Sequence, residues 1–236
     1  MECKYCGSCK IKKNGKSLGK QRYKCKECGK TFFDTKPKFS EELKQKAILM
    51  YLNNVGVRKT AMFIGCSRTT VTNWVKKANE KLDKKLKKFE PNYSQETDII
   101  ELDEIYTYVQ KNKKEQSYGL AYSRLQKRVI AYHIGEGKSA AKEIYRKVKK
   151  LRPNISHIYS DANSCYDIAF SEMKIPEQHT MTKSETHLIE SSNSSIRDNL
   201  ARFNRKSKRF SKSFSFLDFT LQLFFYKHFL FTAINF

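Results

Sequence analysis

The sequence lacks three features that would each indicate a particular class of protein. It contains no glycine-rich phosphate-binding loop, so nothing in it predicts the use of a nucleoside triphosphate. Its opening residues, MECKYCGSCK, contain no apolar segment of an export signal. The apolar C-terminal run is interrupted by Asp218, Lys227 and His228, which favours a packing helix over a membrane span. We therefore expect an intracellular protein that does not cross a membrane.

Acidic side chains are scarce relative to basic ones. The 236 residues include 47 Lys and Arg but only 24 Asp and Glu, which gives a formal net charge of +23. Residues 1–90 hold 24 basic side chains against 8 acidic ones, so most of the excess lies in the N-terminal part. Such an excess destabilises a compact chain by self-repulsion, and its usual counterpart is a polyanion. The composition therefore predicts a nucleic-acid partner.

The seven cysteines indicate metal binding rather than disulfides, given the absence of an export signal. Two CxxC turns, CKYC and CKEC, are separated by 18 residues, a spacing typical of zinc ribbons. Four thiolates leave no open coordination position, so the zinc would be structural, with the ligands Cys3, Cys6, Cys25 and Cys28. Cys9 leaves a second pairing with Cys6 open, and a redox dithiol is the alternative. We assign residues 1–36 to this ribbon.

Residues 37–90 have the pattern of a helix-turn-helix domain followed by a basic linker. Ser40 is placed to cap a first helix, and GVRKTAMFIGCSRTTVTNWVKKANEKL predicts two more helices that meet at Gly65. In this motif the second helix enters the major groove and leads with polar side chains. The candidate DNA contacts at its start are Arg68, Thr69, Thr70 and Asn73. A three-helix packing unit without DNA binding is the alternative.

Residues 97–236 alternate between strand-like and helix-like segments. Three consecutive strand patterns, DIIELDEIYTYV, QSYGLAYSR and RVIAYHIG, predict an antiparallel meander. A helix, a short strand, a short helix, another strand and a long helix follow, and an aromatic helix ends the chain. This order predicts an α/β domain with a mixed sheet.

Carboxylates within apolar segments mark the candidate catalytic site. Asp103 lies in the first strand and Asp161 follows a later one, so the two meet if these strands are neighbours. Carboxylates this close repel one another unless a divalent cation relieves the charge, and hard oxygen ligands suit Mg²⁺ or Mn²⁺. The long helix offers Glu190 as a third acid, with Glu185 as the alternative. Arg197 lies two turns after Glu190, where it can reach a DNA phosphate.

The other titratable residues near these acids receive minor roles. Glu101 and Glu104 flank Asp103, and we expect them at the solvent-facing side or edge of the sheet, at most supporting a metal ligand. A turn or helix cap is the alternative role for Asp161. The histidines show no ligand spacing, so we expect them at the surface or in the core: His133, His157, His179, His187 and His228.

The order of these modules resembles the transposases of the insertion-sequence-one family. The matching stretches are CKYC, NGKSLGKQRYKCKECGKTF, NNVGVRKTAMFIGCSRTTVTNWVK, IIELDEIYTYV, YSDANSCY and HLIESSNSSIRDNLARFNRKSKRFSKS. They cover most of the chain from Cys3 to Ser213, and the last is the most specific. Two departures are Cys9, an extra cysteine, and an interval of 28 residues between Asp161 and Glu190, slightly longer than expected.

The resemblance implies a ribonuclease H-like catalytic domain with a DDE-type site. Asp103, Asp161 and Glu190 match its three acids, and Arg197 matches the basic residue that follows the glutamate. The implied activity is cleavage at transposon terminal inverted repeats and strand transfer into target DNA. The implied partners are double-stranded DNA and further copies of the chain, in the cytoplasm at the nucleoid, or in a nucleus. The alternatives are a DNA-binding regulator with an inactive domain, and a metal-dependent nuclease without joining activity.

Overall fold

The computed structural model describes residues 1–33, 38–88, 96–109, 114–203, 211 and 213–227. The chain divides into two compact units, Met1–Leu43 and Lys44–Phe236. His228, the basic stretch 204–210 and the expected domain boundaries near residues 36 and 90 lie outside the described residues. The division into three domains therefore stays a prediction.

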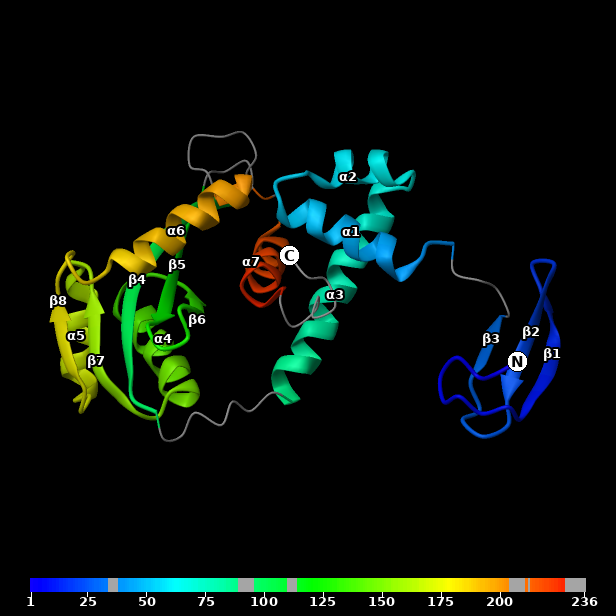
Figure 1. Cartoon of the computed structure of the whole chain (residues 1–236), viewed down its shortest axis with the longest axis horizontal. Helices are drawn as coiled ribbons and strands as arrows, with labels where there is room; N and C mark the ends of the chain where they lie inside the picture. Colours follow the sequence, from blue (N-terminus) through cyan, green and yellow to red (C-terminus); the bar gives the residue numbers. More distant parts are fainter. Residues whose placement is uncertain (34–37, 89–95, 110–113, 204–210, 212, 228–236) are drawn as a thin grey trace. The chain divides into compact units, whose positions relative to one another are not determined.

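The first unit contains a small antiparallel sheet (Figure 1). It also contains two cysteine-bearing turns. Strands β1 (Ile11–Ser17), β2 (Lys20–Cys25) and β3 (Thr31–Phe33) pair in that order. Its buried apolar cluster consists of Cys3, Cys25 and Phe32. Chains shorter than about 40 residues usually need a metal, a disulfide or a partner to remain folded. This core is therefore too small to hold the unit together unaided.

Three helices follow, and Ser40 and Gly65 lie at the helix ends where the sequence places them. Helix α1 (Glu41–Leu52) begins after Ser40, whose hydroxyl accepts a hydrogen bond from the backbone N–H of Leu43 at 3.2 Å. Helix α2 (Val57–Ile64) ends at Gly65, which turns the chain in the left-handed conformation with φ of 70°. Helix α3 (Arg68–Lys88) begins after Ser67. Apolar residues of α1 and α3 form one cluster with a helix near the C-terminus: Ile48, Tyr51, Leu52, Val75, Ala78, Leu82 and Leu223.

A five-stranded mixed sheet forms the centre of the rest of the chain. Its strands are β4 (Asp98–Val109), β5 (Lys114–Ser123), β6 (Arg128–Ile134), β7 (Ile155–Ser160) and β8 (Gln178–Met181). They lie in the order β6-β5-β4-β7-β8. The first three strands pair antiparallel, whereas β7 pairs parallel with both β4 and β8. The predicted meander and the mixed α/β fold are therefore confirmed, and β4 is the central strand.

Helices cover both faces of this sheet. Helices α4 (Gly137–Leu151) and α5 (Ser164–Met173) pack with the core residues Ile100 and Leu102 of β4. The opposite face of β4 packs against α6 (His187–Asn199), a 3₁₀ turn (Ala201–Phe203) and α7 (Phe214–Tyr226). Alternate side chains of β4 thus enter two different cores, as the pleat of a strand requires.

The start of α6 is attached to the sheet by a buried carboxylate. Glu101 is fully buried, and its Oε2 accepts hydrogen bonds from the backbone N–H groups of Leu188 at 3.1 Å and Ile189 at 3.0 Å. Its Oε1 accepts a bond of 2.7 Å from Nε of Arg124. A negative charge satisfies the unpaired N–H groups of a helix N-terminus and interacts favourably with the helix dipole. The expectation that Glu101 faces solvent or an edge is wrong, because these donors compensate its burial.

Replacing Glu101 with alanine should destabilise the fold strongly. The change leaves the Arg124 guanidinium and two helical N–H groups without their shared acceptor, so we expect the free energy of unfolding to fall by about 3–5 kcal/mol. Urea denaturation followed by circular dichroism measures this. Glu172→Ala is the matched control, because Glu172 pairs with Lys138 and Lys142 at the surface and should matter little. Equal effects of the two substitutions would contradict the capping role.

Candidate functional site

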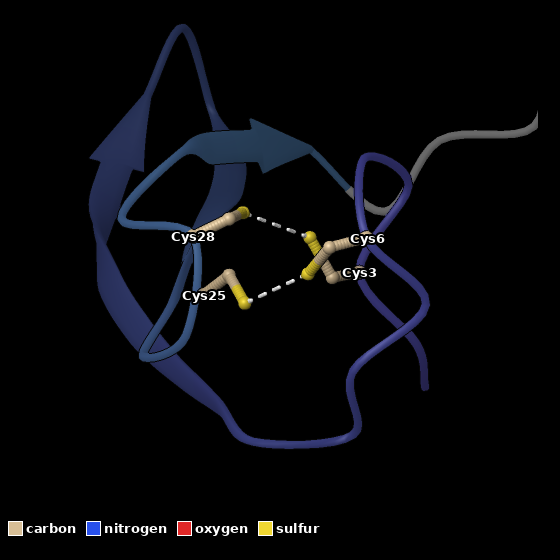
Figure 2. A group of neighbouring side chains, drawn as sticks. All are labelled: Cys3, Cys6, Cys25 and Cys28. Carbon is tan, nitrogen blue, oxygen red and sulfur yellow. Dashed lines mark hydrogen bonds between the residues drawn. The ribbon is translucent and has the colours of Figure 1, made fainter.

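Four cysteines from the two CxxC turns meet in the first unit (Figure 2). The sulfur of Cys3 lies 3.6 Å from that of Cys28, and the sulfur of Cys6 lies 3.6 Å from that of Cys25. Sulfurs bound at about 2.3 Å to one tetrahedral zinc ion lie about 3.8 Å apart, so the observed spacing fits that ion. All four thiols are free rather than joined in disulfides. The predicted ligand set is therefore brought together.

The backbones of the two cysteine turns correspond hydrogen bond for hydrogen bond. Gly7 donates to the carbonyl of Cys3 at 2.9 Å, and Gly29 donates to that of Cys25 at 3.1 Å. Both glycines have φ near +70°, a conformation that glycine adopts without strain. The backbone N–H of Cys28 lowers the pKa of the Cys25 thiol, which favours the metal-binding thiolate. Cys9 lies outside the cluster, so the alternative pairing of Cys6 with Cys9 is not the one formed.

Three carboxylates gather where β4 extends past its parallel neighbour. The pairing of β4 with β7 ends at Leu102 and Ser160, and Asp161 follows directly. Beyond that point, side chains from both faces of β4 approach the loop that carries Asp161. One oxygen from each of Asp103, Glu104 and Asp161 lies within 4.8 Å of the other two. The predicted meeting of Asp103 with Asp161 is confirmed. Glu104, expected at an edge or toward solvent, lies in the same group of carboxylates.

Neutral amides, rather than cations, orient these carboxylates. Asn193 of α6 is buried and donates from Nδ2 to Oδ2 of Asp103 at 2.6 Å. Asn163 donates from its backbone N–H to Oδ1 of Asp161 at 3.2 Å and from its side chain to Glu104 at 3.1 Å. Sequence reasoning missed both asparagines, since each lies in a polar run, SSNSS or DANS, in which a surface residue and a buried partner look alike.

The carboxylate cluster has no positive partner within the part of the chain that the structure describes. Among the described residues, no ion pair includes Asp103, Glu104, Asp161 or Glu190, whereas other buried acids such as Glu101 and Glu177 pair with Arg or Lys. Burial, together with the nearby charges of Asp161 and Glu190, raises the pKa of Asp103 to about 6. Burial also raises the pKa of Glu104. A site of this kind favours a bound cation.

The donor set fits a hard divalent cation. It consists of carboxylate oxygens, which Mg²⁺ and Mn²⁺ prefer. The side-chain oxygen of Asn193 is buried and has no hydrogen-bond partner among the described residues. Buried polar atoms are almost always paired in native proteins, so this oxygen fits a role as acceptor for water bound to such a cation. None of the histidines in the described part of the chain belongs to either candidate metal group.

The third acid expected from the sequence is Glu190, with Glu185 as the alternative, and the two glutamates have different contacts in the structure. Arg124 binds the Glu185 carboxylate at 2.9 Å, which commits that residue to an ion pair. Glu190 lies in the first turn of α6, is exposed, and is close enough for its charge to raise the pKa of Asp103. It stands outside the tight three-carboxylate group. Arg197 lies in the last turn of the same helix and is partly exposed.

The candidate DNA contacts occupy the first two turns of α3. Arg68, Thr69 and Asn73 are exposed there. Thr70 differs, because its backbone N–H donates to the Ser67 hydroxyl at 3.1 Å and its own hydroxyl lies 2.9 Å from that oxygen. Thr70 therefore belongs to the cap that starts the helix. No helix within the described ranges has the length and apolar character needed to cross a membrane.

The fold and the site together define a mixed α/β protein with a carboxylate site suited to a divalent metal. The family model described as IS1 transposase matches residues 98–231, more than half of the chain. The chain therefore belongs to the IS1 transposase family, as the sequence resemblance indicates. The ribonuclease H-like classification of the sheet domain stays a prediction of the sequence resemblance.

Similar proteins include further insertion-element proteins. Insertion element IS1 2 protein InsB of Escherichia coli (strain K12) is 35% identical over 121 residues, covering 50% of this chain and 69% of that protein. Insertion element IS1 protein InsB of Shigella sonnei is 34% identical over 114 residues, covering 48% and 82%. Among solved structures, the Drosophila P element transposase strand transfer complex matches with 13% identity and a TM-score of 0.38, covering 60% of this chain and 37% of that one.

Removing zinc should unfold the first unit and leave the second intact. The described part of the unit has only three buried residues in its core, so a bound metal would supply most of its folding free energy. We expect about one equivalent of zinc per chain in the reduced protein, retained in Cys9→Ser and lost in Cys25→Ser. Metal analysis measures the zinc, and NMR spectra before and after chelation show which residues unfold. Less than about half an equivalent in the wild-type protein would contradict the ribbon.

Replacing Asp103 with asparagine should stabilise the metal-free protein near neutral pH. The folded-state pKa of about 6 lies above the ordinary 3.8, so this group favours folding at low pH and loses that contribution as the pH rises through about 6. The unpaired oxygen of Asn193 can accept from the new amide after a side-chain flip.

We expect the Asp103→Asn protein to gain on the order of 1–2 kcal/mol in free energy of unfolding at about pH 7.5, and less at about pH 5. Urea denaturation of the metal-free protein at both pH values measures the difference. A loss of stability at the higher pH, or the same gain at both values, would show that the ionised carboxylate is not under strain in the fold.

Proposed function

We propose that this protein is a DNA transposase that cleaves at the terminal inverted repeats of its element and joins those ends to target DNA. Asp103, Asp161 and Glu190 would hold Mg²⁺ or Mn²⁺ for the phosphoryl transfer. The observation that supports the proposal best is the group of carboxylates at the end of a parallel strand, without any cationic partner among the described residues, in a member of the IS1 transposase family.

The protein's own residues hold the acids in place. A divalent cation bound there supplies Lewis acidity for the attacking hydroxyl and stabilises charge on the leaving oxygen. Asn193 orients Asp103 from α6, and Asn163 orients Asp161 from the start of α5. Glu190 approaches the same place from the first turn of α6. Arg197, two turns further along this helix, would bind a DNA phosphate beside the site.

The N-terminal region would provide the DNA contacts that select the transposon ends. Helices α2 and α3 form the proposed helix-turn-helix, with Arg68, Thr69 and Asn73 reading bases and Thr70 supporting the cap. Exposed lysines along α3, Lys76 and Lys77 among them, would contact phosphates and make binding sensitive to salt. The zinc ribbon of residues 1–36, the helix-turn-helix domain and linker of 37–90, and the catalytic domain of 97–236 are the proposed division.

The assembly and the location follow from the reaction. Two transposon ends must be brought together before joining, so we propose a homodimer or a larger homo-oligomer, with the aromatic C-terminal helix as an interface. The described part of that helix, α7, buries Leu217 and Leu221 beside the sheet and Leu223 against α1 and α3, so the proposed contacts would involve its exposed start, where Phe214 lies. The proposed site of action is the nucleoid, or the nucleus in a eukaryotic host.

Labelled transposon-end DNA, incubated with the protein and Mg²⁺ or Mn²⁺, tests the proposal. We expect cleaved ends and joined products, both reduced at least about 100-fold in Asp103→Asn, Asp161→Asn and Glu190→Gln. Glu172→Gln, which removes a surface carboxylate of α5, should retain full activity. Arg68→Ala should weaken end binding about tenfold or more while leaving metal affinity unchanged.

The outcomes separate the proposal from its competitors. Cleavage without joined products identifies a nuclease. Specific binding of the ends with neither product identifies a regulator with an inactive domain. Full activity in Asp103→Asn would contradict the proposed catalytic site.

A further inference from the structure

We propose that Glu104 is a positioning residue that holds the loop carrying Asp161 against β4, acting through Asn163 and not as a metal ligand. This inference rests on the proposed function, because the orientation of Asp161 matters only if the carboxylate site is catalytic. The sequence places Glu104 beside Asp103 without indicating what it contacts.

Asn163 joins three separate elements through three of its polar groups. Its backbone N–H donates to Oδ1 of Asp161 at 3.2 Å. Its side-chain oxygen accepts from the backbone N–H of Cys165 at 3.1 Å and caps the start of α5. Its side-chain nitrogen donates to Oε1 of Glu104 at 3.1 Å. The position of Asp161 therefore depends on a residue that is anchored both to a helix and to the central strand.

Glu104 is held in turn by the core on its own side of the sheet. The hydroxyl of Tyr166 lies close enough to interact with its carboxylate, and Tyr166 is almost completely buried in the cluster that α5 forms with the sheet. The hydrogen bond from Asn163 and the neighbouring Tyr166 together restrain the carboxylate. A side chain held in this way can fix the position of the loop that is hydrogen-bonded to it.

The loop needs such an anchor because the sheet does not extend to it. The pairing of β4 with β7 stops at Leu102 and Ser160, one residue before Asp161. A short loop without ladder hydrogen bonds samples several backbone conformations, and ordering them costs free energy. Catalytic groups must be held within about 0.5 Å of their productive geometry by the residues around them. Glu104 supplies this support from the strand that also carries Asp103.

Proximity alone also allows Glu104 to be a ligand, since its carboxylate belongs to the group within 4.8 Å. The two roles predict opposite results for Glu104→Gln. A glutamine keeps an oxygen that accepts from Asn163 and an amide that donates to the Tyr166 hydroxyl, so the support survives. It loses the negative charge that a metal ligand needs.

The test compares Glu104→Gln, Glu104→Ala and Asn163→Ser in the full-length protein. Serine keeps the helix cap of α5 but cannot reach Glu104, so it separates loss of the anchor from loss of the cap. Mn²⁺ affinity, measured by calorimetry without DNA, and the rate of end cleavage are the two readouts. Thermal unfolding in the absence of metal identifies any variant that does not fold.

We expect Glu104→Ala and Asn163→Ser each to weaken Mn²⁺ affinity and cleavage by about 10–100-fold. In the double variant, Mn²⁺ affinity and cleavage rate should be at most about twofold lower than in the more impaired single variant, since the two residues act as one unit. Glu104→Gln should remain within about threefold of the wild-type protein in both readouts. If Glu104→Ala does not fold, Glu104→Gln and Asn163→Ser decide the question.

A loss of Mn²⁺ affinity in Glu104→Gln as large as that in Asp103→Asn would overturn the proposal and make Glu104 a ligand. Wild-type behaviour of Asn163→Ser would also overturn it. Failure of the proposed function looks different, because the wild-type protein itself would then bind no Mn²⁺ or would bind it equally well in Asp103→Asn.

Discussion

The contact between Glu101 and the N-terminus of α6 is the constraint on which the candidate site depends. It attaches α6 to the central strand, and a second contact, from Asn193 to Asp103, follows further along both elements. The two carboxylates are two residues apart, about 6.6 Å along a strand. Their partners on α6 are four to five residues apart, about 6–7.5 Å along a helix. The spacing along the strand thus matches the spacing along the helix, which fixes α6, the helix that carries Glu190, against β4.

The acids of β4 divide into those with a cationic partner and those without. Glu101 is paired with Arg124 and serves the fold, whereas Asp103 and Glu104 are oriented by uncharged amides. In a chain with 47 basic residues, a cluster of acids without a cation among the described residues is an unusual arrangement. Neutral partners fix the direction of a carboxylate and leave its charge uncompensated. This combination is what a site for a divalent cation requires.

Local patterns predicted the strands, the helix caps and the cysteine ligands, since each depends on residues close in sequence. The meeting of Asp103 with Asp161 was also predictable, because it needs only that two strands be neighbours. The role of Glu101 was not, since alternation along a strand assigns a face without showing which helix end lies against it. The choice between Glu185 and Glu190 depends on Arg124, some 60 residues earlier, which a sequence pattern cannot show. Asn163 and Asn193 escaped notice for the same reason.

The central claim is that Asp103 and Asp161 share a divalent cation held by a site that neutral amides arrange. Anomalous scattering from crystals of the protein grown with saturating Mn²⁺ tests this most directly. The account predicts one or more manganese peaks bounded by the carboxylates of Asp103 and Asp161, with Asn193 still bonded to Asp103. Well-ordered crystals without a peak between these two carboxylates would contradict it.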